Sequence, residues 1–222
     1  MKYLLLVLSI SFSIPTWAQH GHLNVGAVGK NQGDPLKFDN GLDYLASSGY
    51  LKTLNFAASG KFSNYFNGNI SLTVIHSFNG LGDPVPGSPA PGSLIEVQIA
   101  RVSGPSDGSF SFWDDAVSTT GPAFSVPTGT SEGTNRYMLS DTSLGAGAPG
   151  ADPFGHIHGR RFTVDKPGIS TVGFKAVDIS TNGTGAGPIH TPSDILDITF
   201  QAGHNFSTLT RTNQTAYITI GT

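Results

Sequence analysis

Apolar and polar residues alternate along several short stretches of the chain, the pattern of half-buried β-strands. The longest such run is 67–78, where every second residue from Ile70 onward is apolar up to His76 and Phe78. Similar alternation predicts further strands at 49–56, 94–102, 109–113, 136–139, 169–179, 194–200 and 207–220. No segment carries a sustained helical period with capping residues, so we expect any helix to be short.

Glycine and proline divide these strands from one another. The chain contains 29 glycines and 14 prolines spread over its length, and three segments rich in turn residues, 79–93, 143–155 and 180–188, are predicted to be loops. We find no composition shift that would separate two domains. The sequence therefore predicts a single all-β domain, an antiparallel β-sandwich of jelly-roll or Greek-key type.

The first 18 residues have the features of a secretory signal peptide. Lys2 precedes an apolar run at 3–14, which is too short to span a membrane, and Thr16-Trp17-Ala18 fits a cleavage site. We therefore predict residues 1–18 as a signal peptide and 19–222 as the mature β-sandwich. The protein is expected to be exported, to the periplasm or the extracellular space, with no membrane span after signal removal.

Composition excludes several classes of function. Cysteine is absent, so no disulfide or thiolate ligand is available. Charged residues make up 12% of the chain and the formal net charge is −3, which argues against a nucleic-acid partner. Neither a GxSxG nucleophile motif nor a phosphate-binding glycine loop is found.

The densest polar chemistry lies in DPFGHIHGRRFTVDKPG, residues 152–168. If this segment is one extended strand, His156, His158, Arg160 and Phe162 share a face, and two imidazoles two residues apart can converge on one metal ion. A second HxH pair opens the mature chain, and a further histidine follows the third loop. The predicted metal ligands are His20, His22, His156, His158 and His190.

Imidazole suits zinc, copper and nickel alike, so the residues alone do not select one ion; we expect Zn²⁺ on the resemblance described below, with copper as the alternative. Asp152 or Asp165 could add an oxygen ligand. Whether the five histidines form one site or two is left open. The pairs could instead be unconnected surface groups, with the N-terminal pair in a disordered tail.

Other polar and aromatic residues have simpler interpretations. The pattern places His76 among apolar neighbours as a partly buried histidine, and it favours Trp113 as a core anchor. Arg160 and Arg161 are interpreted as sheet-face charges, with the binding of a phosphate or carboxylate as their functional alternative.

Several segments resemble a known family: HGHLNVGA, SGYLKTL, FSFW, DPFGHIHGRRFTVDKPG, STVGFKAVD and GPIHTPSDI. Together they are similar to exported bacterial proteins, many of PEP-CTERM type, whose cyanobacterial members are controlled by the zinc uptake repressor. Residues 155–178 are also similar to the repeat of actinobacterial surface-anchored (choice-of-anchor M) proteins, which are linked to zinc and manganese transport loci. The resemblance implies a secreted zinc-binding β-sandwich; it does not extend to the C-terminal sorting helix with its Arg-rich tail.

Our leading hypothesis is a binding protein for metal acquisition or storage, without enzymatic activity, that passes its ion to a metal transporter or an envelope component. The alternative enzyme is a copper oxidase of the histidine-brace kind, which would need signal cleavage after Gln19 so that His20 becomes the first residue. A third hypothesis is a structural or adhesive surface sandwich in which the ion ties the N-terminal segment to the sheet. The sequence leaves the oligomeric state open.

Overall fold

The computed structural model describes residues 21–114, 120–157 and 160–203, and it confirms the predicted fold class of a single all-β domain. Its regular structure consists of strands and a few short 3-10 helices. The 3-10 helices are Gly41–Tyr44, Ala46–Ser48, Thr142–Leu144 and Thr184–Ala186. The strands are β1 (His22–Ala27), β2 (Leu36–Phe38), β3 (Lys52–Phe56), β4 (Phe66–Gly68), β5 (Ser71–Val74), β6 (Ile95–Ser103), β7 (Ser109–Trp113), β8 (Phe124–Pro127), β9 (Arg136–Met138), β10 (His156–Ile157), β11 (Arg161–Val164), β12 (Gly168–Asp178) and β13 (Leu196–Ala202).

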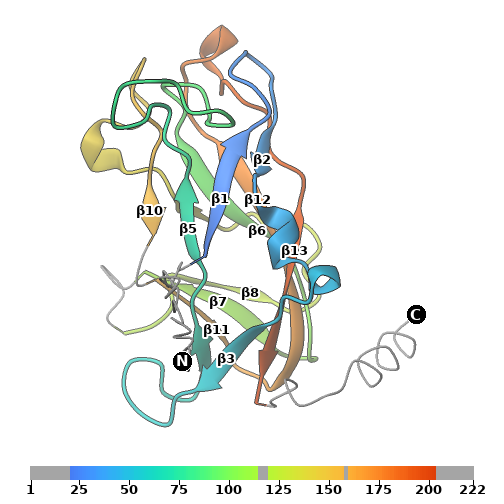
Figure 1. Ribbon diagram of the computed structural model, residues 1–222. Coiled ribbons are helices and arrows are strands. Elements are labelled where there is room, and N and C mark those ends of the chain that lie inside the picture. Colours follow the sequence, from blue (N-terminus) through green and yellow to red (C-terminus); the bar gives the residue numbers. More distant parts are fainter. Residues whose placement is uncertain (1–20, 115–119, 158–159, 204–222) are drawn as a thin grey trace, which may run out of the picture.

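The strands form two sheets (Figure 1). One has four strands in the order β10-β5-β1-β2, and the other has nine in the order β8-β7-β11-β4-β3-β13-β12-β6-β9. Most neighbours are antiparallel, but β1 pairs with β5 and β13 pairs with β3 in parallel. The sheets are therefore mainly antiparallel, with two parallel pairs that the alternation pattern did not predict.

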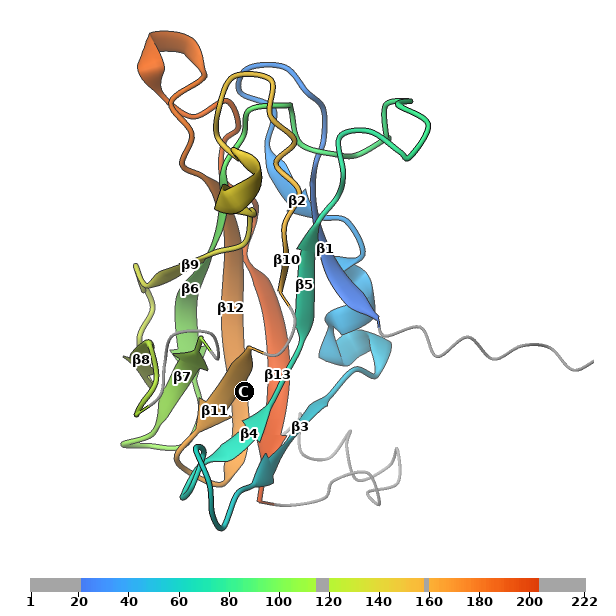
Figure 2. The same ribbon diagram turned by 90° about the vertical axis from the view of Figure 1, so that its left-hand side faces the viewer.

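The three longest strands of the large sheet, β6, β12 and β13, run through most of the height of the molecule (Figure 2). The four-stranded sheet faces their upper part. In the lower part the large sheet curls, so that β7, β11, β4 and β3 come round to face the same long strands. One layer is thus continuous from top to bottom, and the layer opposite is built from two different sheets.

Two of the segments that connect the sheets are only a few residues long. The first leaves β4 at Gly68 and enters β5 at Ser71; the second runs from β10 to β11. We call the region where these two segments cross from one sheet to the other, marked by Asn69 and Arg161, the waist. The prediction of one extended strand through residues 156–162 is wrong, because the chain changes sheet there.

Because the chain changes sheet, His156 and Phe162 do not lie on one face, as the single-strand prediction required. His156 is exposed on the four-stranded sheet, whereas Phe162 is 2% exposed in the core of the curled sheet. Alternation cannot be extrapolated across a point where a strand leaves its neighbours, because the side-chain direction is set separately by each sheet.

The core is continuous through both halves. Large aromatic rings fill the curl of the lower half, with the ring of Phe162 5.3 Å from Phe110 and 5.6 Å from Phe174. Aliphatic side chains such as Leu23 and Leu72 line the upper half. Each fully buried side chain of this size stabilises the fold by about 1.5–3 kcal/mol. This core holds the domain together without disulfide bonds, since the chain has no cysteine.

Trp113 is buried, as predicted, but on the outer side of the curled sheet. Its indole nitrogen donates a hydrogen bond to Thr163 Oγ1 at 2.8 Å. Phe62 and Tyr65, from the segment between β3 and β4, cover the ring at centroid distances of 5.0 and 5.5 Å. This satellite cluster holds the β3–β4 loop against the sheet.

The three predicted loops gather at the upper end of the molecule (Figure 1). The side-chain amide of Asn182 donates to the carbonyls of Gly92 and Gly147, which ties all three loops together. Buried Asp178 accepts hydrogen bonds from four backbone N–H groups in this region, those of Leu94, Ser180, Ile189 and His190.

Strands β2 and β8 lie in segments for which the alternation pattern predicted no strand. The predicted signal peptide and the predicted strand at 207–220 lie outside the described residues. Within 21–114, 120–157 and 160–203, no helix has the length and apolar character needed to cross a membrane.

Candidate metal site

Two of the predicted ligands, His22 and His156, meet on the outer face of the four-stranded sheet. His22 begins β1 opposite Ser71 of β5, and His156 lies in β10 opposite Thr73 of the same strand. β5 therefore lies between the two histidines. Because the intervening Leu72 points into the core, Ser71 and Thr73 face outward beneath the two imidazoles.

The two rings touch across β5. The Nε2 atoms of His22 and His156 are 2.8 Å apart, and the ring planes stand nearly perpendicular at 81°. At this distance one nitrogen donates a hydrogen bond and the other accepts it. Two ligands of a tetrahedral zinc ion, each about 2.0–2.1 Å from the metal, would be roughly 3.3 Å apart. A small opening of the pair would therefore admit an ion between the nitrogens.

The backbone that carries His22 is fixed by Asn40. The Asn40 amide nitrogen donates to the carbonyl of His22 at 2.7 Å, and its oxygen accepts the N–H of Asn24 at 2.8 Å. Asn40 thus satisfies the hydrogen bonding of two backbone groups at the start of β1. The sequence carries no local signal for this role.

The backbone before His156 is fixed by close packing. A Cβ atom on Gly155 would lie 1.8 Å from the carbonyl oxygen of Leu139, so only glycine fits there. The Gly155 carbonyl accepts hydrogen bonds from Val74 N–H at 2.9 Å and Thr73 Oγ1 at 3.0 Å. The glycine preceding the histidine pair in the sequence is therefore required for β10 to reach β5.

His76 is exposed, contrary to the prediction that it is partly buried among apolar neighbours. β5 ends at Val74, so the alternation does not continue to His76. The ring stacks on Phe154 at 3.4 Å, and its Nδ1 is 3.5 Å from Asp152 Oδ2. A groove of about 650 Å³ runs beside these rings and reaches Asn24 and Thr73 next to the histidine pair.

His190 lies apart from the pair, at the far end of β1, roughly 16 Å along the strand from His22. It is 1% exposed. Its Nε2 accepts the N–H of Ala90 at 2.9 Å, so Nδ1 carries the proton that is donated to the carbonyl of Asp34 at 2.8 Å. Each ring nitrogen therefore hydrogen-bonds to the backbone of a different loop. Binding of a metal by His190 would break one of these hydrogen bonds.

The two remaining predicted ligands, His20 and His158, lie outside the described residues. Within the described part of the chain, no group of three or more histidine, aspartate or glutamate side chains is placed to hold a metal ion. The prediction that His20 and His158 supply further ligands stays a prediction.

The two aspartates considered as oxygen ligands have structural partners. Asp165 Oδ1 accepts the N–H of Ser109 at 2.7 Å. Asp152 Oδ1 accepts the N–H of Phe154 at 3.0 Å and of Ser77 at 3.2 Å. Neither carboxylate joins His22 and His156 in a described metal-binding group.

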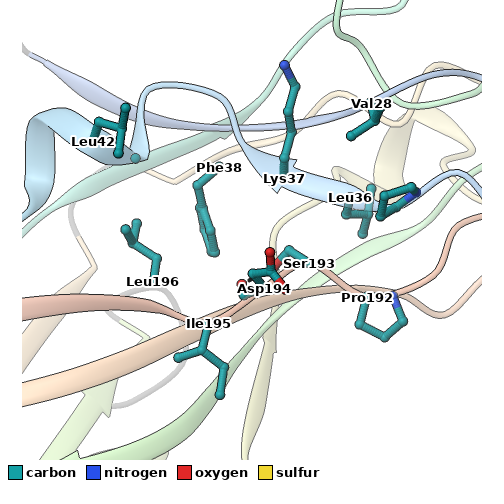
Figure 3. A pocket seen from close by; sticks show the side chains of 12 residues that line it. Val28, Leu36, Lys37, Phe38, Leu42, Pro192, Ser193, Asp194, Ile195 and Leu196 are labelled. Carbon is teal, nitrogen blue, oxygen red and sulfur yellow. Dashed lines mark hydrogen bonds between the residues drawn. The ribbon is translucent and has the colours of Figure 1, made fainter.

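A second hollow of about 430 Å³ lies between β2 and the start of β13 (Figure 3). Phe38, Leu36 and Leu196 line it, and its only charged side chains are Lys37 and Asp194. Lys37 pairs with Asp39 at 2.6 Å. This hollow contains no histidine, and its chemistry is distinct from that of the pair.

Comparison with known proteins gives no further guide to these sites: no family model, no curated protein and no solved structure matches the chain.

Proposed function

We propose that this protein is an exported, periplasmic or extracellular, metal-binding protein that holds zinc through His22 and His156 and acts in metal acquisition or storage. Export rests on the sequence of residues 1–18. The metal assignment rests on one observation, the 2.8 Å approach of two imidazole Nε2 atoms from strands that are not adjacent.

The contact between the two imidazoles depends on the fold, because both histidines must be positioned by their strands to produce it. His22 and His156 are 134 positions apart in the chain, and each reaches over β5 from a different side. Two imidazole nitrogens directed at one point form half of a tetrahedral zinc shell. Without a metal the two nitrogens share a hydrogen bond, which a bound zinc ion would replace.

The other half of the shell is expected from the sequence. His20 precedes His22 by two residues and His158 follows His156 by two residues. Four nitrogen donors would close the shell and leave no open position for catalysis, as in a carrier or a structural site. The proposal therefore favours binding over enzymatic activity.

The first test is metal content and zinc affinity. Mature protein without a histidine tag is purified, analysed for bound metals, stripped with a chelator and titrated with zinc against a chromophoric chelator. We expect about one zinc per chain. The His22→Ala/His156→Ala double variant should lose tight binding, and His76→Ala, which removes an exposed histidine beside the groove, should keep it.

Unchanged zinc affinity in the double variant would contradict the assignment. Copper in place of zinc in the purified protein would keep the site and change the ion. Single variants His20→Ala and His158→Ala then test the two predicted ligands outside the described residues, each of which should weaken binding while the fold is retained.

A further inference from the structure

Arg161 differs from the other arginines of the described chain. Arg101 pairs with Asp197, Arg136 lies 3.9 Å from Glu96, and Arg160 lies 3.2 Å from Asp114. Among residues 21–114, 120–157 and 160–203, no carboxylate pairs with Arg161. Within the described part of the chain its guanidinium makes one hydrogen bond, from Nη1 to Asn69 Oδ1 at 3.4 Å.

A second cation lies near Arg161. Lys52 begins β3 and is half-buried, with no carboxylate partner in the described part of the chain. Burial lowers the pKa of its ammonium group, and the positive charge of Arg161 lowers it further. The Lys52 side chain lies beside Gly68, which pairs with Phe162 next to Arg161, so the two half-buried cations are on the strands that flank β4 at the waist. An anion between them would offset their repulsion.

The waist cations adjoin the histidine pair. Asn69 lies two residues before Ser71, the partner of His22, and four before Thr73, the partner of His156. Asn69, Ser71 and Thr73 follow the outer side of one continuous segment, because Gly68, Ile70 and Leu72 between them are buried. Arg161, hydrogen-bonded to Asn69, therefore lies near the start of β5, the strand that separates the two imidazoles.

We propose that Arg161, with Asn69 and Lys52, forms a binding site for a small oxyanion, a carboxylate or phosphate group, at the waist beside the histidine pair. The guanidinium offers five N–H donors in a planar fork that matches two oxygens of such a group, and the described residues accept from only one of these donors. The Asn69 amide oxygen accepts from Arg161, which leaves its nitrogen as a donor to the same anion.

This site does not require the proposed metal, and it would act together with a metal if one is bound. A cation held by His22 and His156 would strengthen the attraction for an anion on the same face, and the anion would strengthen binding of the cation by the same factor. The neighbouring Arg160 is not part of the site, because Asp114 already neutralises its charge.

The test uses the full mature protein after chelator treatment, so that it is independent of metal binding. Inorganic phosphate and acetate are titrated separately by calorimetry at low ionic strength. We expect saturable binding of at least one of them, weakened at least 10-fold by Arg161→Gln. Arg160→Gln removes the same charge one residue away and should weaken binding less than 3-fold.

Circular dichroism and thermal unfolding confirm that each variant is folded, and Lys52→Gln should give an intermediate loss of affinity. Tighter binding of phosphate than of acetate would identify a phosphate group as the ligand, and the reverse order a carboxylate. Saturation by neither anion, or equal affinity in wild type and Arg161→Gln, would overturn the proposal. Neither result would bear on zinc binding, which is measured separately with the histidine variants.

Discussion

The histidine pair and His190 show how one residue type serves two purposes in this fold. His190 is buried, and both ring nitrogens hydrogen-bond to backbone groups of distant loops. His22 and His156 lie on an outer sheet face and direct Nε2 atoms at each other. All three were predicted as metal ligands, and the structure brings together only the two from HxH motifs.

The difference lies in what the ring nitrogens contact. A buried imidazole must satisfy both nitrogens, and the backbone of the surrounding loops does so for His190. An imidazole on a sheet face can turn toward a ligand. The comparison therefore predicts that His190 contributes to stability and the pair to binding.

The largest effect is expected for His190→Ala. The change leaves the Ala90 N–H and the Asp34 carbonyl without their partner and opens a cavity, which should lower the free energy of unfolding by about 2–5 kcal/mol. Urea denaturation measures this. Exposed His76→Ala is the control and should cost about 1 kcal/mol or less. Equal losses in both variants would remove the distinction between the two environments.

The reverse pattern is expected for His22→Ala and His156→Ala. Each removes a ligand and should weaken zinc binding by more than the roughly 10- to 100-fold that loss of a ligand's supporting group causes. The free energy of unfolding of the metal-free protein should change little for exposed His156, since its ring is not part of the core. Competition titration and urea denaturation of the same preparations give both numbers.

Zinc should stabilise the fold if the pair binds it. Zinc at about 100 times its dissociation constant would add roughly 2.7 kcal/mol to the free energy of unfolding, because the unfolded chain does not hold the two histidines together. Thermal unfolding with and without zinc measures this. The stabilisation should vanish in the His22→Ala/His156→Ala double variant and persist in His76→Ala.

Protonation should oppose zinc binding at the pair. A metal displaces a proton from each protonated imidazole ligand. Once both imidazoles are protonated, apparent zinc affinity should therefore fall by up to about 100-fold per pH unit for two histidine ligands. A zinc titration repeated from pH 8 to pH 5.5 checks this, and a flat profile would exclude imidazole ligands.

A smaller effect concerns the tyrosines beside the start of β1. Burial, followed by interaction with Tyr44, raises the pKa of Tyr50 to about 12. The folded state thus favours the neutral phenol, so this contribution to stability is present below pH 10 and is lost as pH rises toward 12. In a pH titration followed by phenolate absorbance, the Tyr50→Phe variant should lack one of the tyrosines that ionise late in the wild type. Titration of Tyr50 near pH 10 would contradict its burial.

The sequence was sufficient for the fold class because alternation survives wherever a strand keeps its neighbours. β6, β7 and β12 were predicted nearly to their ends. Short edge strands such as β2 and β8 carry too few residues for a period to be recognised. The segment around His156 was predicted in the wrong geometry, since no local feature marks the change of sheet between β10 and β11.

The candidate site was predictable in part. The HxH motifs correctly singled out two histidines that meet, although the pairing of β1 and β10 with β5 depends on the whole fold. The burial of His190 was not predictable, because its partners Ala90 and Asp34 are 100 and 156 positions away. Arg161 was distinguished from Arg160 only by the position of Asp114.

The central claim is that zinc binds the ring nitrogens of His22 and His156 and not those of His190. A long-range proton–nitrogen NMR spectrum of the imidazole rings, recorded before and after one equivalent of zinc, tests it directly. We predict that the Nε2 signals of His22 and His156 move to metal-bound positions, while His190 keeps a protonated Nδ1 and an accepting Nε2. Unmoved signals for the pair, or a shifted His190, would contradict the account.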